Sequence, residues 1–138
     1  MKIATYNIWD SDAGMPFRMQ QLLDEIILID ADILCLQEVA SLELHTKIAS
    51  ACGCKYAYYH DKPKLSVMSK TDGEPIKDHD FGSAHSIQFN GKALNIINVH
   101  LPWESILQRE KTIVEITAIT VDRKNDYTFL LGDFNSSP

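Results

Sequence analysis

The stretch DILCLQE, residues 32–38, decides the fold of this chain. Its centre, Ile33 to Leu36, is a short continuous apolar run, which is typical of a β-strand buried on both faces. The run ends in the polar pair Gln37 and Glu38. Strands of this kind occur in sheets that are covered by helices. The stretch therefore predicts an α/β fold with a carboxylate at the end of an interior strand.

Helical patterns flank this strand on both sides. On its N-terminal side, apolar residues in the segment 19–27 recur at helical spacing, and Pro16 suits the first turn of a helix. On its C-terminal side, Ser41 suits the N-cap of a second helix and Gly53 suits its C-terminal stop. A strand-like segment at residues 2–8 precedes both helices, so the first part of the chain predicts the order β-α-β-α.

Strand patterns dominate the rest of the chain. Residues 56–59 and 65–68 are strand-like, and Asn90-Gly91 between two further strand-like segments predicts a β-hairpin. A third helix is predicted over residues 104–120, followed by a last strand over residues 127–131. We therefore expect a single α/β domain with a mixed β-sheet and flanking helices.

The charge of the chain limits its partners. Thirteen basic and nineteen acidic residues give a net charge of −6, and Lys and Arg do not cluster. Sequence-independent binding to nucleic acid needs a basic surface that displaces counterions from phosphates, and this chain lacks that signature. An acidic protein can still act on phosphates when metal ions screen the repulsion.

Two features predict a cytoplasmic location without a transmembrane segment. The longest apolar cluster, residues 26–29, is too short to span a bilayer and is followed by Asp30 and Asp32. The N-terminal residues lack the apolar core of a secretory signal.

The chain has three cysteines, whose odd number argues against a disulfide framework. Cys52 and Cys54 form a Cys-Gly-Cys motif, but a second pair of ligands for a structural zinc site is missing. Cys35 lies within the apolar run at residues 33–36, where we expect it to be a small core residue.

Polar side chains follow four of the predicted strands. They are Asn7, Glu38, His100, Asp133 and Asn135. Each has an ordinary interpretation on its own, because Asn and Gly-Asp pairs satisfy turns, Glu is solvated or forms ion pairs, and His is packed and hydrogen-bonded. Open sheets, however, gather their ligand sites at strand ends, so the five residues together predict a functional site.

The same residues carry the groups that phosphoester hydrolysis requires. Glu38 is a hard oxygen donor suited to Mg²⁺, Mn²⁺ or Ca²⁺. Asp133 can accept a proton from a water molecule, and the amides of Asn7 and Asn135 can donate to a phosphate oxygen or hold a carboxylate. His100 can hydrogen-bond a non-bridging oxygen. A metal ion, a positioned water and donors for developing charge are the needs of this reaction.

Four motifs in the same order resemble the endonuclease/exonuclease/phosphatase superfamily, which includes DNase I-like nucleases, exonuclease III-like repair enzymes, inositol-polyphosphate phosphatases and neutral sphingomyelinases. The segments IATYNIW at 3–9 and DILCLQEV at 32–39 resemble its first two strands, with their Asn and Glu. NVHL at 98–101 resembles the strand with its phosphate-contacting His, and LGDFNS at 131–136 resembles its Gly-Asp-Phe-Asn motif.

The resemblance implies a role for each of the five residues. Glu38, supported by Asn7, would hold the divalent metal, which the resemblance suggests is Mg²⁺. Asp133 would orient or deprotonate the attacking water, and Asn135 and His100 would contact the scissile phosphate. The substrate would be a phosphodiester or phosphomonoester of a small molecule, a lipid head group or a nucleic acid.

The family fold is a four-layer α/β/β/α sandwich that continues beyond the Gly-Asp-Phe-Asn motif to a terminal Ser-Asp-His element. Residues 1–138 are therefore expected to be the N-terminal portion of such a domain, about half of the sandwich, with an exposed sheet face that a homodimer would cover. Two functions stay open at this point. The chain is a divalent-metal-dependent phosphoester hydrolase, or it is catalytically incomplete and serves as a metal- or phosphate-binding pocket or as a binding or assembly module.

Overall fold

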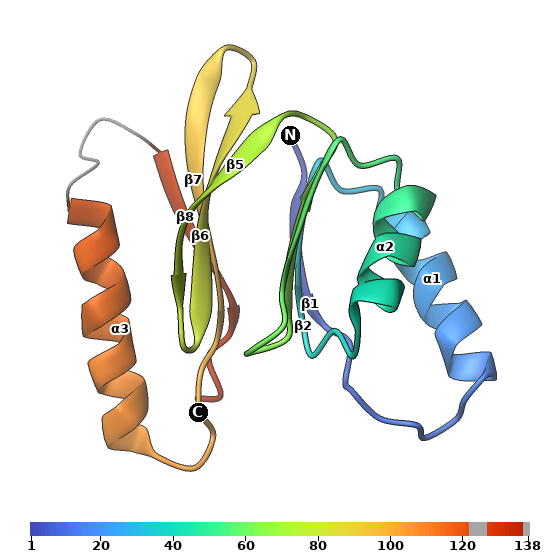
Figure 1. The fold of residues 1–138 in the computed structure, drawn as a ribbon, viewed down its shortest axis with the longest axis horizontal. Coiled ribbons are helices and arrows are strands. Elements are labelled where there is room, and N and C mark those ends of the chain that lie inside the picture. Colours follow the sequence, from blue (N-terminus) through green and yellow to red (C-terminus); the bar gives the residue numbers. More distant parts are fainter. Residues whose placement is uncertain (122–126, 137–138) are drawn as a thin grey trace.

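The structure is a computed structural model that describes residues 1–121 and 127–136. The helices are α1 (Phe17–Ile29), α2 (Leu42–Ala51) and α3 (Ile106–Val121). The strands are β1 (Ile3–Asn7), β2 (Ile33–Gln37), β3 (Tyr56–His60), β4 (Leu65–Ser69), β5 (Gly73–His79), β6 (Gly82–Phe89), β7 (Lys92–His100) and β8 (Tyr127–Asp133). They form four layers, with α1 and α2 outside one sheet and α3 outside the other (Figure 1).

Each sheet has four strands and combines parallel with antiparallel pairs. The first sheet has the order β1-β2-β4-β3, in which β1 and β2 are parallel. The second has the order β5-β6-β7-β8, in which β7 and β8 are parallel. Parallel neighbours need a long crossover, and α1 and α3 lie within those two connections. The predicted mixed α/β fold with flanking helices is confirmed, with its strands divided over two sheets.

Local sequence signals account for most of these elements. Ser41 caps α2, since its hydroxyl oxygen accepts a hydrogen bond of 3.2 Å from the backbone N–H of Leu44. The Asn90-Gly91 pair joins β6 to β7 as the predicted hairpin. The Asp72-Gly73 pair, a turn signal in the sequence, lies where the chain passes from β4 to β5. This strand is a polar edge strand, GEPIKDH, without the apolar alternation by which strands are identified.

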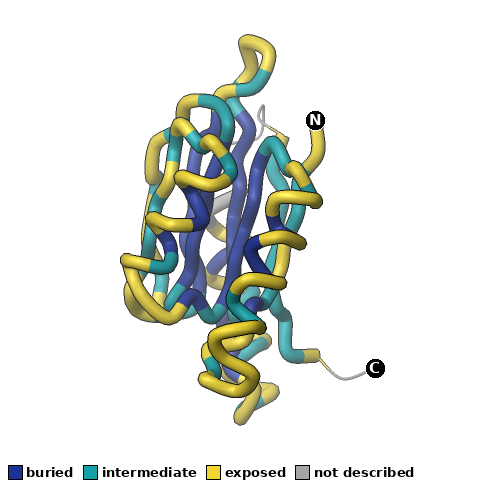
Figure 2. Tube along the Cα trace, turned by 90° about the vertical axis from the view of Figure 1, so that its right-hand side faces the viewer, coloured by how far each residue is buried: buried dark blue, intermediate teal, exposed yellow. Residues whose placement is uncertain are grey.

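Apolar layers explain why the run at residues 33–36 has no polar side chain. Ile33 and Cys35 face the second sheet, in a cluster completed by residues such as Val67, Ile87 and Ile96. Leu34 and Leu36 face α1 and α2 on the other side of the same sheet. Full burial of a side chain such as Ile contributes about 1.5–3 kcal/mol. Figure 2 shows the strands as the buried centre between exposed helices and loops.

The two sheets cover each other's inner faces within one chain. The expected exposed sheet face is therefore not found among the described residues, and the homodimer that would cover it has no support. Cys35 is completely buried between the sheets, as expected for a core residue. None of the described helices is long and apolar enough to cross a membrane.

Candidate active site

The two parallel strand pairs bring their carboxyl ends to one end of the sandwich, the lower end in Figure 1. In the first sheet, Asn7 pairs with Gln37, and Glu38 follows directly. In the second sheet, His100 pairs with Asp133. Because β1 and β8 also lie against each other across the sandwich, the strand ends of both sheets meet at one place.

Asn7 connects the two sheets at this place. Its amide nitrogen Nδ2 donates one hydrogen bond of 2.8 Å to Glu38 Oε1 and another of 2.9 Å to Asp133 Oδ2. Its amide oxygen Oδ1 accepts a hydrogen bond of 2.9 Å from the backbone N–H of Trp9. The orientation of the amide is therefore determined, with both N–H groups directed at carboxylates.

Glu38 lies in a strained loop that presents its carboxylate to the site. Its second oxygen, Oε2, accepts a hydrogen bond of 3.0 Å from the backbone N–H of Asp10. Glu38 and Trp9 have φ angles of 59° and 55°, in the left-handed region that residues other than glycine rarely adopt. Such conformations cost free energy and are concentrated at functional sites, where the surrounding structure holds them.

His100 lies beside both carboxylates. Its ring nitrogen Nε2 is 3.8 Å from Glu38 Oε1 and 4.0 Å from Asp133 Oδ2. The side chains of His100, Glu38 and Asp133 are 20%, 28% and 30% exposed, so all three remain in contact with solvent. A ligand that approaches from solvent can therefore reach this group.

The environment of Asp133 favours its ionised form. Burial acts to raise the pKa of this carboxyl group, but hydrogen bonds from Asn7 and from the backbone N–H of Asn135, together with the charge of His100, outweigh burial and lower the pKa below its ordinary value. Asp133 is consequently a carboxylate at neutral pH, and it acts as a hydrogen-bond acceptor.

Asn135 joins the loops that follow β7 and β8. Its backbone N–H donates to Asp133 Oδ1 at 2.9 Å, and its side-chain Nδ2 donates to the carbonyl oxygen of Leu101 at 2.7 Å. Its φ angle of 45° is again in the left-handed region. Since an amide nitrogen carries two hydrogens, one N–H of Asn135 is left for a further acceptor.

Gly132 allows β8 to approach β7 closely enough to place Asp133. Its φ angle is +136°, and a Cβ atom built at this position would lie 2.0 Å from the carbonyl oxygen of Val99. No side chain fits in that space. The glycine before Asp133 is therefore required by backbone contact between the two strands, in addition to its conformational freedom.

Sequence analysis missed a buried polar pair directly beneath the site. Asn98 Oδ1 accepts a hydrogen bond of 2.6 Å from Gln37 Nε2, and Asn98 Nδ2 donates to the carbonyl oxygens of Leu36 and Ser66, each at 3.0 Å. Both amides are buried, so these bonds fix the separation of the sheets. The signal in the sequence is weak: Gln37 ends the apolar strand β2, and Asn98 lies among the apolar residues of β7.

The donor set at this end fits a metal that keeps water ligands. Glu38 and Asp133 supply hard carboxylate oxygens, and Mg²⁺ is bound through one or two carboxylates together with waters and substrate phosphates. Within the part of the chain that the structure describes, no group of three or more His, Cys, Asp and Glu side chains is arranged to hold a metal. The residues present therefore fit Mg²⁺ shared with a ligand better than a metal cage built by the protein alone.

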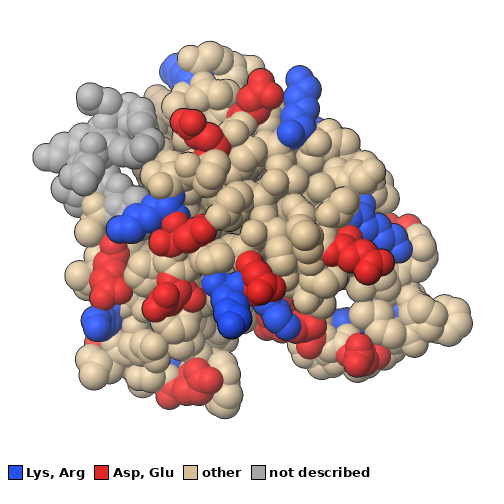
Figure 3. All heavy atoms as spheres, viewed as in Figure 1, with Lys and Arg blue, Asp and Glu red and all other residues tan. Residues whose placement is uncertain are grey.

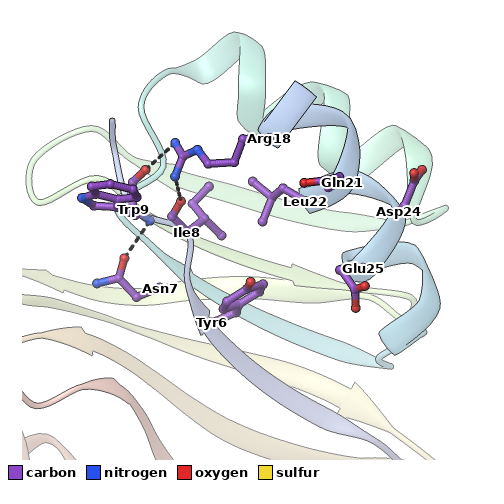
Figure 4. Close-up of a pocket in the computed structure, with 9 residues that line it drawn as sticks. All are labelled: Tyr6, Asn7, Ile8, Trp9, Arg18, Gln21, Leu22, Asp24 and Glu25. Carbon is purple, nitrogen blue, oxygen red and sulfur yellow. Dashed lines mark hydrogen bonds between the residues drawn. The ribbon is translucent and has the colours of Figure 1, made fainter. Parts of the chain in front are cut away.

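Two open cavities, each of about 550 Å³, adjoin the site. The first extends from Asn7 towards α1 (Figure 4), and the Arg18 guanidinium lies 5.0 Å from the ring centre of Trp9 in its wall. The second is lined by residues that include Trp103 and Asp133. Trp9 and Trp103 are 56% and 74% exposed, so an exposed indole lies in each of these cavities.

Charges on the visible face in Figure 3 are mixed. Acidic and basic side chains are interspersed there, and this face shows no continuous basic surface. The picture agrees with the sequence, in which Lys and Arg do not cluster.

Two packed mixed sheets between helices, with polar side chains at shared strand ends, define the DNase I-like class of α/β folds. The family model described as "Endonuclease/Exonuclease/phosphatase family" matches residues 4–138, and the chain belongs to this family. Members of the family are phosphoesterases or nucleases. A comparison with curated proteins finds no match.

Solved structures share the fold at low sequence identity. Truncated TDP2 from Caenorhabditis elegans has a TM-score of 0.77 at 18% identity, covering 99% of this chain and 62% of that chain. Sphingomyelinase C from Streptomyces griseocarneus has a TM-score of 0.73 at 16% identity, covering 99% and 64%. A β-hairpin deletion mutant of β toxin from Staphylococcus aureus has a TM-score of 0.72 at 17% identity, covering 98% and 67%. The chain thus spans less than two thirds of the truncated TDP2 chain and of sphingomyelinase C.

Proposed function

We propose that this chain is a divalent-metal-dependent phosphoester hydrolase. The observation that carries the proposal is the double hydrogen bond of Asn7, which joins Glu38 to Asp133 while His100 lies 3.8 and 4.0 Å from the same two carboxylates. Membership of a family of phosphoesterases and nucleases supports the same reaction class. The proposal applies to the site as the described residues form it.

In this proposal, Asp133 orients the attacking water. Because the pKa of Asp133 is lowered, its carboxylate accepts hydrogen bonds but is a weak base. Such a group is better suited to orienting the water molecule than to removing a proton from it. His100 and the remaining amide N–H of Asn135 donate hydrogen bonds to the phosphate oxygens, where negative charge develops. Asn7 acts as a positioning residue, because its hydrogen bonds hold the carboxylates of Glu38 and Asp133 in fixed positions relative to each other.

Glu38 is the residue that would hold the metal, with Asn7 beside it, and Mg²⁺ is the ion proposed, with Mn²⁺ or Ca²⁺ as substitutes. A divalent ion held here would supply electrophilic stabilisation of phosphate oxygens and would make a nearby water more acidic. The carboxylate of Glu38 is held by Asn7 and by the backbone of Asp10, so it would meet such an ion already oriented.

The proposed substrates are phosphoesters of small molecules, lipid head groups or nucleic acid. Trp9 and Trp103 each line an open cavity beside the site, and exposed indoles suit a planar or apolar group attached to the phosphate. The net charge of −6 favours a substrate that presents one phosphate rather than a long polyanion.

The test is hydrolysis of bis(p-nitrophenyl) phosphate and p-nitrophenyl phosphate, with MgCl₂ or with EDTA. We expect turnover that depends on Mg²⁺. Asp133→Asn should lower kcat by about 10²–10⁴-fold, and Glu38→Gln by a similar factor. The matched control is Asp78→Asn, because Asp78 also accepts a side-chain hydrogen bond but lies on β5, outside the site.

Three results would count against the hydrolase. They are absence of Mg²⁺-dependent turnover, equal loss of rate in the Asp78 control, and unchanged rates in both site variants. Calorimetric binding of Mg²⁺ and inorganic phosphate without turnover would instead identify a binding pocket that has no catalytic activity.

A further inference from the structure

The Cys-Gly-Cys motif has no part in the candidate active site. Cys52 and Cys54 line a small cavity of about 70 Å³ together with Met68. The cavity lies at the other end of the first sheet, since its wall includes Ala31, which precedes β2, whereas Glu38 follows β2. Three sulfur-bearing side chains therefore share one space that the proposed hydrolysis does not use.

The backbone at the end of α2 places both cysteines against the same core. The N–H of Cys54 donates a hydrogen bond of 3.0 Å to the carbonyl oxygen of Ala49, so the chain folds back over the helix end. Gly53 makes this return with a φ angle of +64°. As a result, Cys52 and Cys54 both pack against the apolar cluster that contains Met68.

We propose that this cavity binds a soft monovalent metal ion, Cu(I), through the sulfur atoms of Cys52, Cys54 and Met68. Thiolate and thioether sulfurs are the ligands that select Cu(I), whereas hard cations prefer oxygen. Zinc fits poorly because its structural sites use four ligands from Cys, His or acidic residues. Among the described residues the cavity offers two such ligands in its cysteines, together with Asp30 in an ion pair.

The size of the cavity also suits this ion. One water-sized sphere needs roughly 10–15 Å³, so 70 Å³ accommodates an ion without displacement of the core. Lys70 lines the rim and is paired with Asp30. Cu(I) with two thiolates carries one net negative charge, and the Lys70–Asp30 pair, which is neutral overall, adds no further net charge to the cavity.

Binding exchanges protons for the metal. A cysteine binds a metal as a thiolate, whereas an ordinary thiol is protonated at neutral pH, so each cysteine loses its proton on binding. One Cu(I) forms two Cu–S(thiolate) bonds and one bond to the thioether, and two S–H protons pass to solvent. No electron is transferred, so the step needs no oxidant or reductant.

The test is an anaerobic titration of the reduced, intact chain with the Cu(I)–bicinchoninate complex. We expect the protein to remove one equivalent of Cu(I) and to release two protons per ion. Cys52→Ser and Cys54→Ser should each lower the affinity by about 100-fold or more, and the isosteric Met68→Leu by about 10-fold. The matched control is Cys35→Ala, because Cys35 lies between the sheets and should not affect binding.

A second readout needs no variant and therefore does not depend on correct folding of the variants. Iodoacetamide labelling followed by mass spectrometry should show that Cu(I) protects Cys52 and Cys54 together in the unmodified chain. Protection of neither thiol, or of one alone, would overturn the proposal. So would equal weakening in Cys35→Ala, or displacement of Cu(I) by an equal concentration of Zn²⁺.

Discussion

Among the polar side chains that connect the sheets, two groups differ in how completely their atoms are hydrogen-bonded. The first is the candidate active site. The second, here called the His85 cluster, consists of Tyr56 on β3 and Ser83 and His85 on β6. His85 Nδ1 is 2.7 Å from the Tyr56 hydroxyl, and Nε2 is 2.9 Å from the Ser83 hydroxyl. Both ring nitrogens of a completely buried histidine are therefore hydrogen-bonded.

At the candidate active site, by contrast, the functional groups keep spare capacity. Glu38 and Asp133 each hold oxygens that can accept more hydrogen bonds than the structure gives them, and both side chains reach solvent. A completely buried histidine with both ring nitrogens hydrogen-bonded indicates a structural role, whereas partly exposed carboxylates that are oriented but can accept more hydrogen bonds indicate a site for a ligand.

Gly132→Ala should have the largest effect on stability, and it should act at the active-site end of the sandwich. Gly132→Ala places a Cβ atom 2.0 Å from the carbonyl oxygen of Val99, so β7 and β8 must separate. We expect a loss of about 4 kcal/mol in the free energy of unfolding, measured by urea denaturation. Gly91→Ala is the matched control, because Gly91 also has a positive φ, +74°, but has open space around it and should cost only about 1 kcal/mol. Equal losses would contradict the close contact.

The second prediction concerns the His85 cluster and uses pH. Burial lowers the pKa of His85 from 6.5 to about 4. The unfolded chain therefore binds a proton more readily than the folded chain between these values, and stability falls as the pH decreases from 6.5 to 4. The total loss from this group is roughly 3 kcal/mol. His85→Gln cannot titrate, so its unfolding free energy should lack this part of the pH dependence. A slope that persists in this variant would assign the effect to other groups.

The third prediction tests whether Asn7 positions the two carboxylates. Asn7→Ala should lower kcat/KM by about 10–100-fold with little change in stability. Loss of its hydrogen bond also raises the pKa of Asp133, so the acid limb of the pH–rate profile should move to higher pH. Asn7→Asp keeps the size but replaces both donors by a negative charge, and it should be at least as inactive. Wild-type activity in Asn7→Asp would show that the amide is not needed.

The sequence predicts that these side chains meet because they follow strands whose ends must coincide. The apolar run at residues 33–36 identifies a doubly covered strand, and the two parallel pairs then carry Asn7, Glu38, His100 and Asp133 to one edge. Local patterns could not predict the division into two sheets or the bond between Gln37 and Asn98, because both depend on contacts between residues far apart in the sequence. The polar edge strand β5 was not predicted for a different reason. A strand without an apolar face lacks the alternation of apolar and polar residues by which strands are identified.

The smallest difference in stability is expected between two variants that each remove one tyrosine hydroxyl from β3. Tyr56→Phe removes the partner of a buried ring nitrogen of His85, which should cost about 1–2 kcal/mol in unfolding free energy. Tyr58→Phe removes a hydrogen bond to Asp78, a partly exposed carboxylate that water can solvate, and should cost no more than about 0.5 kcal/mol. The two substitutions delete the same atom from the same strand. A difference in thermal or urea unfolding therefore measures what burial of the acceptor contributes, and equal losses would remove the distinction between a satisfied buried cluster and a solvated one.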